Sequence, residues 1–418
     1  MSTYKVEELF YLAKRESPFY RELYKNIKHF TSLENLPVIQ SESFWHANTH
    51  EDNQILTAPF IDGVVFKSGG TSGNPKFSYF TLQEWETFTE VFGFGLRQGG
   101  LRCGDKIANL FYAGDLYASF LFITKSIEKS QVPVIHFPIS GGIDFNYIVQ
   151  SLNNFSINVW AGVPTTIVKL VEYAEKNKLV APEKILFGGE SMYQDQFDYI
   201  KKIFPNVKIQ SIGYASVDGG LLGFATEKCL PQEHCVFSDH TIMEILDEDT
   251  LKPIQEPLVA GKLYLTNLTR KLMPMIRYPV GDKAYWLTSD SNEKYRRLKI
   301  LGRTEEGARI GPATVYYDDI SVLLAKYHHD FQIKGLQLVT SHFDNKDQLE
   351  IKIASSLQES IDTGVLKREI ENERGFLKSL VLEKQIHPLK ISIVDMRQLE
   401  INTRTGKLKR VIDNRAKI

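Results

Sequence analysis

A glycine-rich stretch, VFKSGGTSGNPKFSYFT at residues 65–81, places the parts of a phosphate-binding loop between two apolar runs. Its glycines, which let backbone N–H groups turn toward one point, are Gly69, Gly70 and Gly73. Its hydroxyl and cationic donors are Ser68, Thr71, Ser72 and Lys76. Asn-Pro follows Gly73, so the loop is not a Walker A motif, which needs Lys-Ser or Lys-Thr there. The donors predict a phosphate cradle, and an exposed turn is the alternative for an isolated loop of this kind.

Three later segments join this loop in a recognisable order. The loop resembles the phosphate-binding signature of adenylate-forming enzymes, the superfamily of acyl-CoA synthetases and peptide-synthetase adenylation domains. YPVGDKAYW at 278–286, ILGRTEEGARI at 300–310 and TRTGKLKRVID at 403–413 resemble its Y-x-T-G-D, G-R-x-D-D and G-K-x-x-R segments. ESPFYRELY, VIHFPISGG and LYLTNLTRKLMPMIRYPVGD read like phenylacetate-CoA ligases, the closest likeness within the superfamily. The resemblance covers nearly the whole chain.

The resemblance implies a two-step reaction. A carboxylate oxygen attacks the α-phosphorus of ATP, which yields an acyl-adenylate and pyrophosphate. A thiol then takes the acyl group and releases AMP. The implied cofactors are ATP, Mg²⁺ and CoA, and the implied partners are a small carboxylic acid and CoA. The protein must neutralise phosphate charge and position both reactants.

Each signature implies a role for particular residues. The loop donors would hold the β- and γ-phosphates, with Thr71 and Lys76 as catalytic members. Asp282 would accept hydrogen bonds from the ribose hydroxyls with help from Arg303. The adenine side would consist of Gly188, Gly189, Glu190, Tyr214, Ala215 and Ser216, with Tyr214 stacked on the base. Taken singly, Asp282 could be a turn residue, Arg303 a surface ion-pair partner and Tyr214 a core residue.

The acid is expected to be apolar or aromatic, because the segments near the presumed pocket have no conspicuous cation. The substrate-binding candidates are Phe137, Ile139, Trp160, Val163, Gly213 and Gly219. The apolar ones among them could instead belong to the core.

Lys407 lies in a basic tail with Arg404, Lys409 and Arg410, which by composition alone suggests a solvated end. The resemblance makes Lys407 the mobile cation that bridges the carboxylate and the ribose and phosphate oxygens during adenylation. It also places a hinge at Glu305, about which a small domain turns before thioester formation.

Two segments depart from the family pattern. YASVDGG at 214–220 has Val217 and Asp218 where a hydroxyl residue and a glutamate are usual, and Asp is one methylene shorter than Glu. Asp218 is the candidate Mg²⁺ ligand; the alternatives are that it acts through a water or that the metal rests mainly on the ATP phosphates. Gly311-Pro312 replaces the usual Arg-Gly in a strip that contributes to the pantetheine tunnel of relatives. CoA is the expected acceptor, and because of this departure the thiol of an acyl carrier protein is the alternative.

A cluster of soft ligands, Cys229, His234, Cys235 and His240, raises the question of a zinc site. Its C-x4-H-C spacing matches no common zinc finger or ribbon, so an ordinary loop is favoured.

The elements that must position these residues alternate between strand and helix. VPVIHFPI, INVWAGV, KILFGGE and VKIQSIGYAS read as strands, and TTIVKLVEYAEKNKL has helical spacing of its apolar residues. HTIMEILDEDTLKPI and GKLYLTNLT read as hairpin strands, and LEIKIA as a strand of a smaller unit. We expect an α/β protein with a large N-terminal adenylate-forming domain of mixed parallel sheets at 1–302 and a small mobile α+β domain at 303–418.

Composition excludes several classes. The 418 residues are 43% apolar with a net charge of −1, which favours a globular protein and disfavours nucleic-acid binding. No signal peptide or membrane-inserted run is evident, and three cysteines in so long a chain suggest reduced thiols, so we expect a cytoplasmic protein. A homodimer is one option for its assembly. Two rival functions are a nucleotide-binding protein that has lost catalysis and a kinase-like NTPase.

Lys407 provides the first test. Lys407→Ala should lose acyl-adenylate synthesis, because the charge that gathers between the carboxylate and the α-phosphate is no longer offset. Supplied with pre-made acyl-adenylate and thiol, the variant should still form thioester at nearly the wild-type rate. Glu305→Pro should show the reverse pattern, since it fixes φ at the hinge. Equal damage by Lys407→Ala to both half-reactions, or to neither, would contradict the assigned role.

Overall fold

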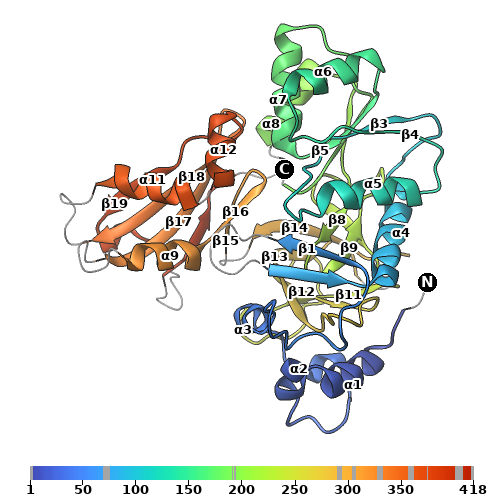
Figure 1. The fold of residues 1–418 in the computed structure, drawn as a ribbon, viewed down its shortest axis with the longest axis vertical. Coiled ribbons are helices and arrows are strands. Elements are labelled where there is room, and N and C mark those ends of the chain that lie inside the picture. The colour runs from blue at the N-terminus through green and yellow to red at the C-terminus, as the bar shows by residue number, and fades with distance from the viewer. Residues whose placement is uncertain are drawn as a thin grey trace.

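The computed structural model describes residues 3–68, 76–190, 192, 194–289, 294–303, 307–326, 333–355, 362–373, 375–400 and 408–415. Two lobes are evident in Figure 1, a large N-terminal lobe and a smaller C-terminal lobe in orange and red. A separate apolar core formed only by residues between 308 and 411 fills the smaller lobe. The large lobe has three main clusters of buried apolar side chains.

A five-stranded sheet carries the first group of candidate residues at the carboxyl ends of its strands. Its order is β4-β3-β5-β6-β7, and every pair is parallel. The strands are β3 (Lys106–Asn109), β4 (Ile135–Pro138), β5 (Val159–Gly162), β6 (Lys184–Phe187) and β7 (Lys208–Ser211). The helices between and beside them are α4 (Leu82–Gln98), α5 (Ser119–Lys129), α6 (Phe145–Asn154), α7 (Pro164–Lys176) and α8 (Gln194–Ile203).

A seven-stranded antiparallel sheet carries the second group. Its order is β11-β12-β13-β14-β10-β9-β8. The strands are β8 (Tyr214–Ser216), β9 (Gly220–Phe224), β10 (Glu233–Val236), β11 (Thr241–Leu246), β12 (Gly261–Asn267), β13 (Tyr278–Trp286) and β14 (Arg297–Arg303). Four strand-to-strand steps separate β8 from β13, about 19 Å in a flat sheet. The Tyr214 hydroxyl nevertheless lies 2.5 Å from the Asp282 carboxylate, so the sheet is strongly curved.

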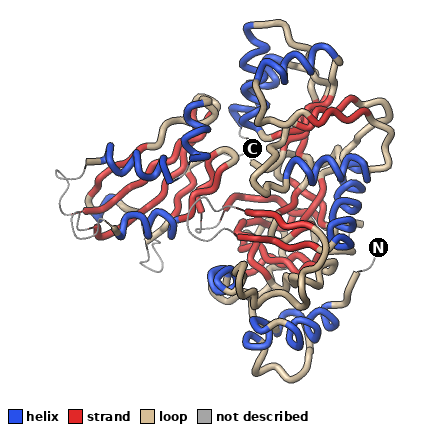
Figure 2. The backbone as a smooth tube through the Cα atoms, viewed as in Figure 1, coloured by secondary structure: helices blue, strands red, loops and turns tan. Residues whose placement is uncertain are grey.

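The N-terminal segment and a short hairpin complete the large lobe. The hairpin is β1 (Val64–Ser68) and β2 (Lys76–Phe80), which pair antiparallel on either side of the glycine-rich loop. The N-terminal helices are α1 (Val6–Glu16), α2 (Pro18–Leu23), η1 (Leu33–Asn35) and α3 (Ser41–His46). They lie at one end of the lobe and α6 to α8 at the other, with strands between them (Figure 2).

The smaller lobe consists of a two-stranded hairpin, a four-stranded sheet and several helices. The hairpin is β15 (Gly307–Ile310) and β16 (Ala313–Tyr316). The sheet has the order β19-β18-β17-β20, with β17 (Ile333–Phe343), β18 (Lys346–Ser355), β19 (Lys390–Val394) and β20 (Val411–Asp413). The helices are α9 (Tyr317–Ala325), α11 (Thr363–Glu373), α12 (Gly375–Leu382) and η3 (Met396–Gln398).

The architecture confirms the predicted α/β class with a large N-terminal and a smaller C-terminal lobe. The predicted strands correspond to β4 to β8, β11, β12 and part of β18, and the predicted helix to α7. Division of the chain at 302/303 stays a prediction, although β14 ends at Arg303. Within the described residues, no helix combines the length and the apolar character that a bilayer crossing requires.

A buried ion pair ties the N-terminal segment to the curved sheet and gives a stability test. Arg277 donates to Glu244 at 3.0 and 3.1 Å and to the carbonyls of Glu34 and Leu36, and both charged side chains are less than a tenth exposed. Arg277→Met should lower the free energy of unfolding by about 3–5 kcal/mol, because it leaves the Glu244 carboxylate buried without its partner. Chemical unfolding followed by tryptophan fluorescence would report this loss, since all four tryptophans precede residue 303.

The matched control is Arg102→Met, which breaks the exposed pair with Glu227 at 3.6 Å. It should cost at most about 1 kcal/mol. Similar unfolding midpoints for the two variants would contradict the assigned weight of the buried pair.

Candidate active site

A cavity of about 170 Å³ opens where the parallel sheet, the curved sheet and the C-terminal lobe meet. Its lining from the parallel sheet and the following loops is Phe187, Gly188, Gly189, Glu190, Ser211 and Gly213. The curved sheet and its connections contribute Tyr214, Ala215, Ser216, Gln232, His234, Val280, Asp282, Ile300 and Gly302. The smaller lobe contributes Arg309, Gly311, Asp347 and Arg415. Seven of these residues were predicted from sequence for the nucleotide, and they converge on one cavity.

Tyr214 and Asp282 form the centre of one wall. The Tyr214 hydroxyl donates a 2.5 Å hydrogen bond to Oδ2 of Asp282, whose residue is 9% exposed. Asp282 and Arg303 are direct cross-strand partners of β13 and β14, so the sheet register brings the two predicted ribose residues side by side. One carboxylate oxygen is thus oriented by a phenol at the cavity wall.

Glu190 follows β6 and reaches the first turn of α7. Its carboxylate accepts hydrogen bonds from the Thr165 hydroxyl at 3.0 Å and from the Thr165 amide at 3.4 Å. Burial raises the pKa of Glu190 to about 7, against the opposing charge of Arg309 and the bonds from Thr165. The group therefore changes charge near neutral pH inside the cavity.

The wall from the C-terminal lobe was not predicted. Asp347 Oδ2 accepts from the Gly311 amide at 2.9 Å and from Arg415 at 2.8 Å, and its Oδ1 lies 2.6 Å from His342 Nδ1. Burial alone would raise the pKa of Asp347, but the His342 bond and the Arg415 charge hold it below its usual value. Gly311 has φ +52°, and a Cβ there would stand 3.3 Å from the Thr165 methyl group across the lobes. The turn therefore approaches α7 closely.

Of this wall, Arg309 and Gly311 lie in a segment that sequence analysis had associated with the pantetheine tunnel. No sequence signal marks Asp347 or Arg415, because both reach the cavity only through the folding and placement of the smaller lobe.

The Cys/His cluster does not converge on a metal. His234 faces the cavity, where its Nε2 lies 2.8 Å from the Ser211 hydroxyl and its ring 5.4 Å from that of Tyr214. The next residue of β10, Cys235, points into the apolar core, since adjacent strand residues face opposite sides. His240 lines a different cavity. In the described part of the chain, no three His, Cys, Asp or Glu side chains are grouped to hold a metal, which argues against the zinc alternative.

Shifted pKa values are also found in the Cys/His cluster. Burial lowers the pKa of His234 to about 4, so the ring is neutral. A hydrogen bond with Cys235 lowers the pKa of the Cys229 thiol to about 6.

Asp218 is held from two sides. Its carboxylate accepts from the Tyr278 hydroxyl at 3.2 Å, and its backbone carbonyl accepts from Arg270. Arg270 is 1% exposed and also donates to the Tyr79 carbonyl at 2.9 Å, so it connects Asp218 with β2. Burial lowers the pKa of Arg270 to about 10, which leaves it cationic at neutral pH.

A second buried charge secures the same region. Glu84 at the start of α4 accepts hydrogen bonds from the amides of Thr81, Lys271 and Leu272 at 2.7–3.0 Å. The segment that follows the glycine-rich loop is thereby fixed to the curved sheet.

The predicted acid-binding residues do not gather at the described cavity. Trp160 is fully buried and packs edge-on against Phe204, Ile139 packs on the same core, and Phe137 lies against Phe155. These positions agree with the alternative that the apolar candidates belong to the core. Gly219 is also buried, and its carbonyl accepts from the Asn267 amide group.

Among the acid-binding candidates, Gly213 lines the cavity. It has φ +133°, and a Cβ there would stand 2.7 Å from the Phe92 ring, so a side chain at this position is excluded. Val163, the residue before α7, is 5% exposed and packs in the core between the two sheets.

Several predicted residues lie outside the described part of the chain, and their roles stay predictions: Gly69, Gly70, Thr71, Ser72, Gly73, Glu305 and Lys407. For Ser68 and Arg303 the structure describes the backbone positions at the ends of β1 and β14. Lys76 is described at the start of β2, on the hairpin that bears the loop.

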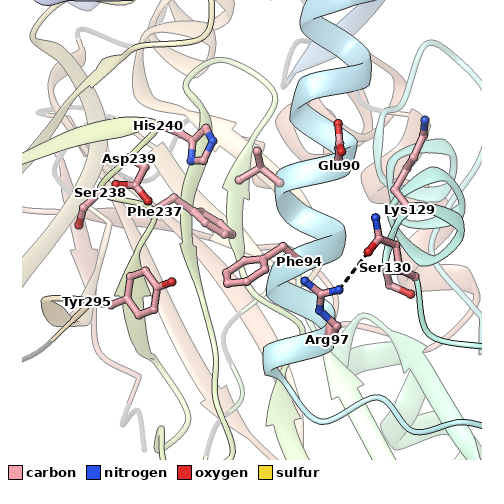
Figure 3. A pocket seen from close by; sticks show the side chains of 12 residues that line it. Glu90, Phe94, Arg97, Lys129, Ser130, Phe237, Ser238, Asp239, His240 and Tyr295 are labelled. Carbon is pink, nitrogen blue, oxygen red and sulfur yellow. Dashed lines mark hydrogen bonds between the residues drawn. The ribbon is translucent and has the colours of Figure 1, made fainter. Parts of the chain in front are cut away.

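A second cavity, of about 240 Å³, is lined by α4, the end of α5 and the connection between β10 and β11. Figure 3 shows Phe94 of α4 beside Phe237, with Tyr295, Asp239 and His240 on the same side, whereas Arg97 is directed toward Ser130. Arg97 donates to Gln131 at 3.1 Å, and Lys129 pairs with Glu86 at 2.5 Å. Its cations thus have protein partners, and the cavity does not share residues with the candidate active site.

Comparison with known proteins gives relatives over nearly the whole chain. No protein-family model matches. A phenylacetate-coenzyme A ligase of Thermus thermophilus is 25% identical over an alignment of 423 positions, which covers 95% of this chain and 92% of that protein. Indoleacetate–lysine synthetase of Pseudomonas savastanoi is 30% identical over 228 residues, 52% of each protein.

Among solved structures, 2-hydroxyisobutyryl-CoA ligase with 2-HIB-AMP and CoA in the thioesterification state has a TM-score of 0.73 at 18% identity. The match covers 98% of this chain and 88% of that one. The same ligase in the postadenylation state has a TM-score of 0.63 at the same coverage. The present arrangement of lobes is therefore more similar to the former.

Glu190 gives a pH test of the cavity. Below the value of about 4.5 that the pKa of this carboxyl has in the unfolded chain, Glu190 is protonated in both the folded and the unfolded state. As the pH rises from there through about 7, the unfolded carboxyl ionises first and the buried one only later, so the free energy of unfolding falls. Glu190→Gln avoids this loss, so its Tm should be close to that of the wild type at pH 5 and a few degrees higher at pH 8. Glu183→Gln, at an exposed neighbouring position, should run parallel to the wild type. A constant Tm difference across this pH range for Glu190→Gln would contradict the prediction.

Proposed function

Because the chain has the fold of the adenylate-forming superfamily and is similar in sequence to phenylacetate-CoA ligases, we propose that it activates an apolar or aromatic carboxylic acid with ATP and passes the acyl group to CoA. The predicted family, AMP-forming acid–thiol ligases, is confirmed by these relatives. The specific acid and the thiol acceptor are the proposal.

The observation that supports the proposal most is the convergence of three separate motif segments on one cavity. Residues 188–190, 214–216 and 282 come from two different sheets, and the resemblance alone had assigned them to adenine and ribose. A chance likeness of short motifs would not place them around a common space.

In the first step, an oxygen of the acid carboxylate bonds to the α-phosphorus of ATP, and the bond to the β-phosphate oxygen breaks. Asp282, oriented by the Tyr214 hydroxyl, would accept hydrogen bonds from the ribose. Lys76 would stabilise the charge on the departing pyrophosphate. In the second step, the thiolate sulfur bonds to the acyl carbon, and AMP leaves with the electron pair of the mixed anhydride bond.

Mg²⁺ would supply charge neutralisation of the phosphates. Among the described residues, Asp218 is the carboxylate at the predicted position, and it already accepts a hydrogen bond from Tyr278. A single carboxylate together with phosphate oxygens and water fits the way in which Mg²⁺ is often bound. We expect the nucleotide to provide most of its ligands.

Two acyl acceptors are alternatives to CoA. Gly311 is the turn that approaches α7, where the family pattern has Arg-Gly, and this difference keeps a carrier-protein thiol as a candidate. An amine is the other candidate, because indoleacetate–lysine synthetase is similar to half of the chain. A nucleotide-binding protein without catalysis is the alternative outside this class.

The decisive measurement is pyrophosphate release from ATP with a panel of aryl, hydroxyaryl and fatty acids. At least one acid should give acid-dependent pyrophosphate and AMP. Lys76→Ala, alone or with Thr71→Ala, should lower the rate about 100-fold or more without unfolding the protein. Lys67→Ala is the matched control, since Lys67 lies on β1 of the same hairpin and pairs with Asp115 at 2.6 Å. It should change the rate little.

Three outcomes would redirect the proposal. ADP as product would indicate a kinase-like enzyme. ATP binding without pyrophosphate for any acid would indicate lost catalysis. An adenylate that reacts with lysine or a carrier protein but not with CoA would replace the acceptor only.

A further inference from the structure

Lys76 lies between two aromatic rings that belong to different lobes. Its Nζ is 5.4 Å from the centre of the Trp45 ring, on α3, and 4.8 Å from the centre of the Tyr316 ring, at the end of β16. Both distances are within the range in which a ring face attracts a cation. Among the described residues, no carboxylate forms an ion pair with Lys76.

Both rings are held by their surroundings. Trp45 donates through its indole N–H to the Tyr278 hydroxyl at 3.0 Å, and Tyr278 in turn donates to Asp218. Tyr316 pairs with Gly307 across the β15–β16 hairpin, where a Cβ on Gly307 would stand 3.2 Å from the Tyr316 ring. The position of the Tyr316 ring is therefore set by the C-terminal lobe, to which the β15–β16 hairpin belongs.

The same ammonium is the one that the proposed function assigns to phosphate oxygens. A strong hydrogen bond to pyrophosphate would draw it toward the anion and away from the two ring faces. The Tyr316 contact exists only when the smaller lobe presents β16 to β2. The present lobe arrangement is also the one that is more similar to a thioesterification state.

We propose that Tyr316 is a positioning residue whose ring binds the Lys76 ammonium after pyrophosphate has left. Pyrophosphate and the lobe arrangement seen here therefore compete for the same ammonium. This inference rests on the proposed phosphate role of Lys76. By reciprocity, pyrophosphate weakens this lobe arrangement to the extent that the arrangement weakens pyrophosphate binding. Tyr316 thereby disfavours return of pyrophosphate to the adenylate before the thiol attacks.

The test is calorimetric titration of the full-length protein with pyrophosphate in the presence of Mg²⁺. Tyr316→Leu removes the ring face but keeps an apolar side chain, and should bind pyrophosphate about threefold to tenfold more tightly than the wild type. Tyr316→Phe keeps the ring and should bind within about twofold of the wild type. A structural defect would weaken binding instead, and it would not be rescued by Phe in this pattern.

The same comparison in a Lys76→Ala background shows whether the effect acts through the ammonium. There, Tyr316→Leu should change pyrophosphate binding by less than about twofold. Equal affinity of the wild type and Tyr316→Leu, or an undiminished gain in the Lys76→Ala background, would overturn the inference. The proposed function would stand in that case, because acid-dependent pyrophosphate release tests it separately. If the wild type and Lys76→Ala bind pyrophosphate equally, or neither binds it, the phosphate role of Lys76 falls and this inference falls with it.

Discussion

Curvature of the seven-stranded sheet is the constraint on which the candidate site depends. In a flat sheet Tyr214 and Asp282 would lie too far apart for any side chain to join them, yet a 2.5 Å hydrogen bond connects them. The bend also turns His234 of β10 toward Ser211 at the end of the parallel sheet. A cavity therefore forms between two sheets of different type, and its polar groups have fixed partners before any ligand enters.

The C-terminal lobe completes this cavity through one carboxylate. Asp347 binds the amide of Gly311 on the β15–β16 turn and the guanidinium of Arg415, so the turn is attached to the main sheet of its own lobe. Because the turn and Tyr316 belong to the same hairpin, a single rigid unit approaches both Thr165 and Lys76. The two sides of the site are thus linked through the smaller lobe.

Sequence reasoning grouped residues that the structure also places together where they lie in short contiguous segments. Gly188 to Glu190, Tyr214 and Asp282 are each part of a recognisable segment, and the structure brings them together. It was less successful with Trp160 and Phe137, because apolar side chains at strand positions suit a substrate pocket and a core equally well. The cluster of Cys229, His234, Cys235 and His240 raised the question of zinc, although an ordinary loop was favoured, because nearness in sequence ignores the alternation of side chains along β10. Arg415 and Asp347 could not be predicted, since their role arises from how the lobes pack.

Arg270 has a consequence for how this protein can change. One buried guanidinium binds the carbonyls of Tyr79 and Asp218, so the strand behind the glycine-rich loop and the acidic segment share a single anchor. A lysine there would have the charge but not the planar fork that reaches both carbonyls at once. The two segments consequently form one structural unit. A redesign of the segment around Asp218 must keep the geometry of the β1–β2 hairpin, and transfer of either into another scaffold would need the arginine and both of its acceptors.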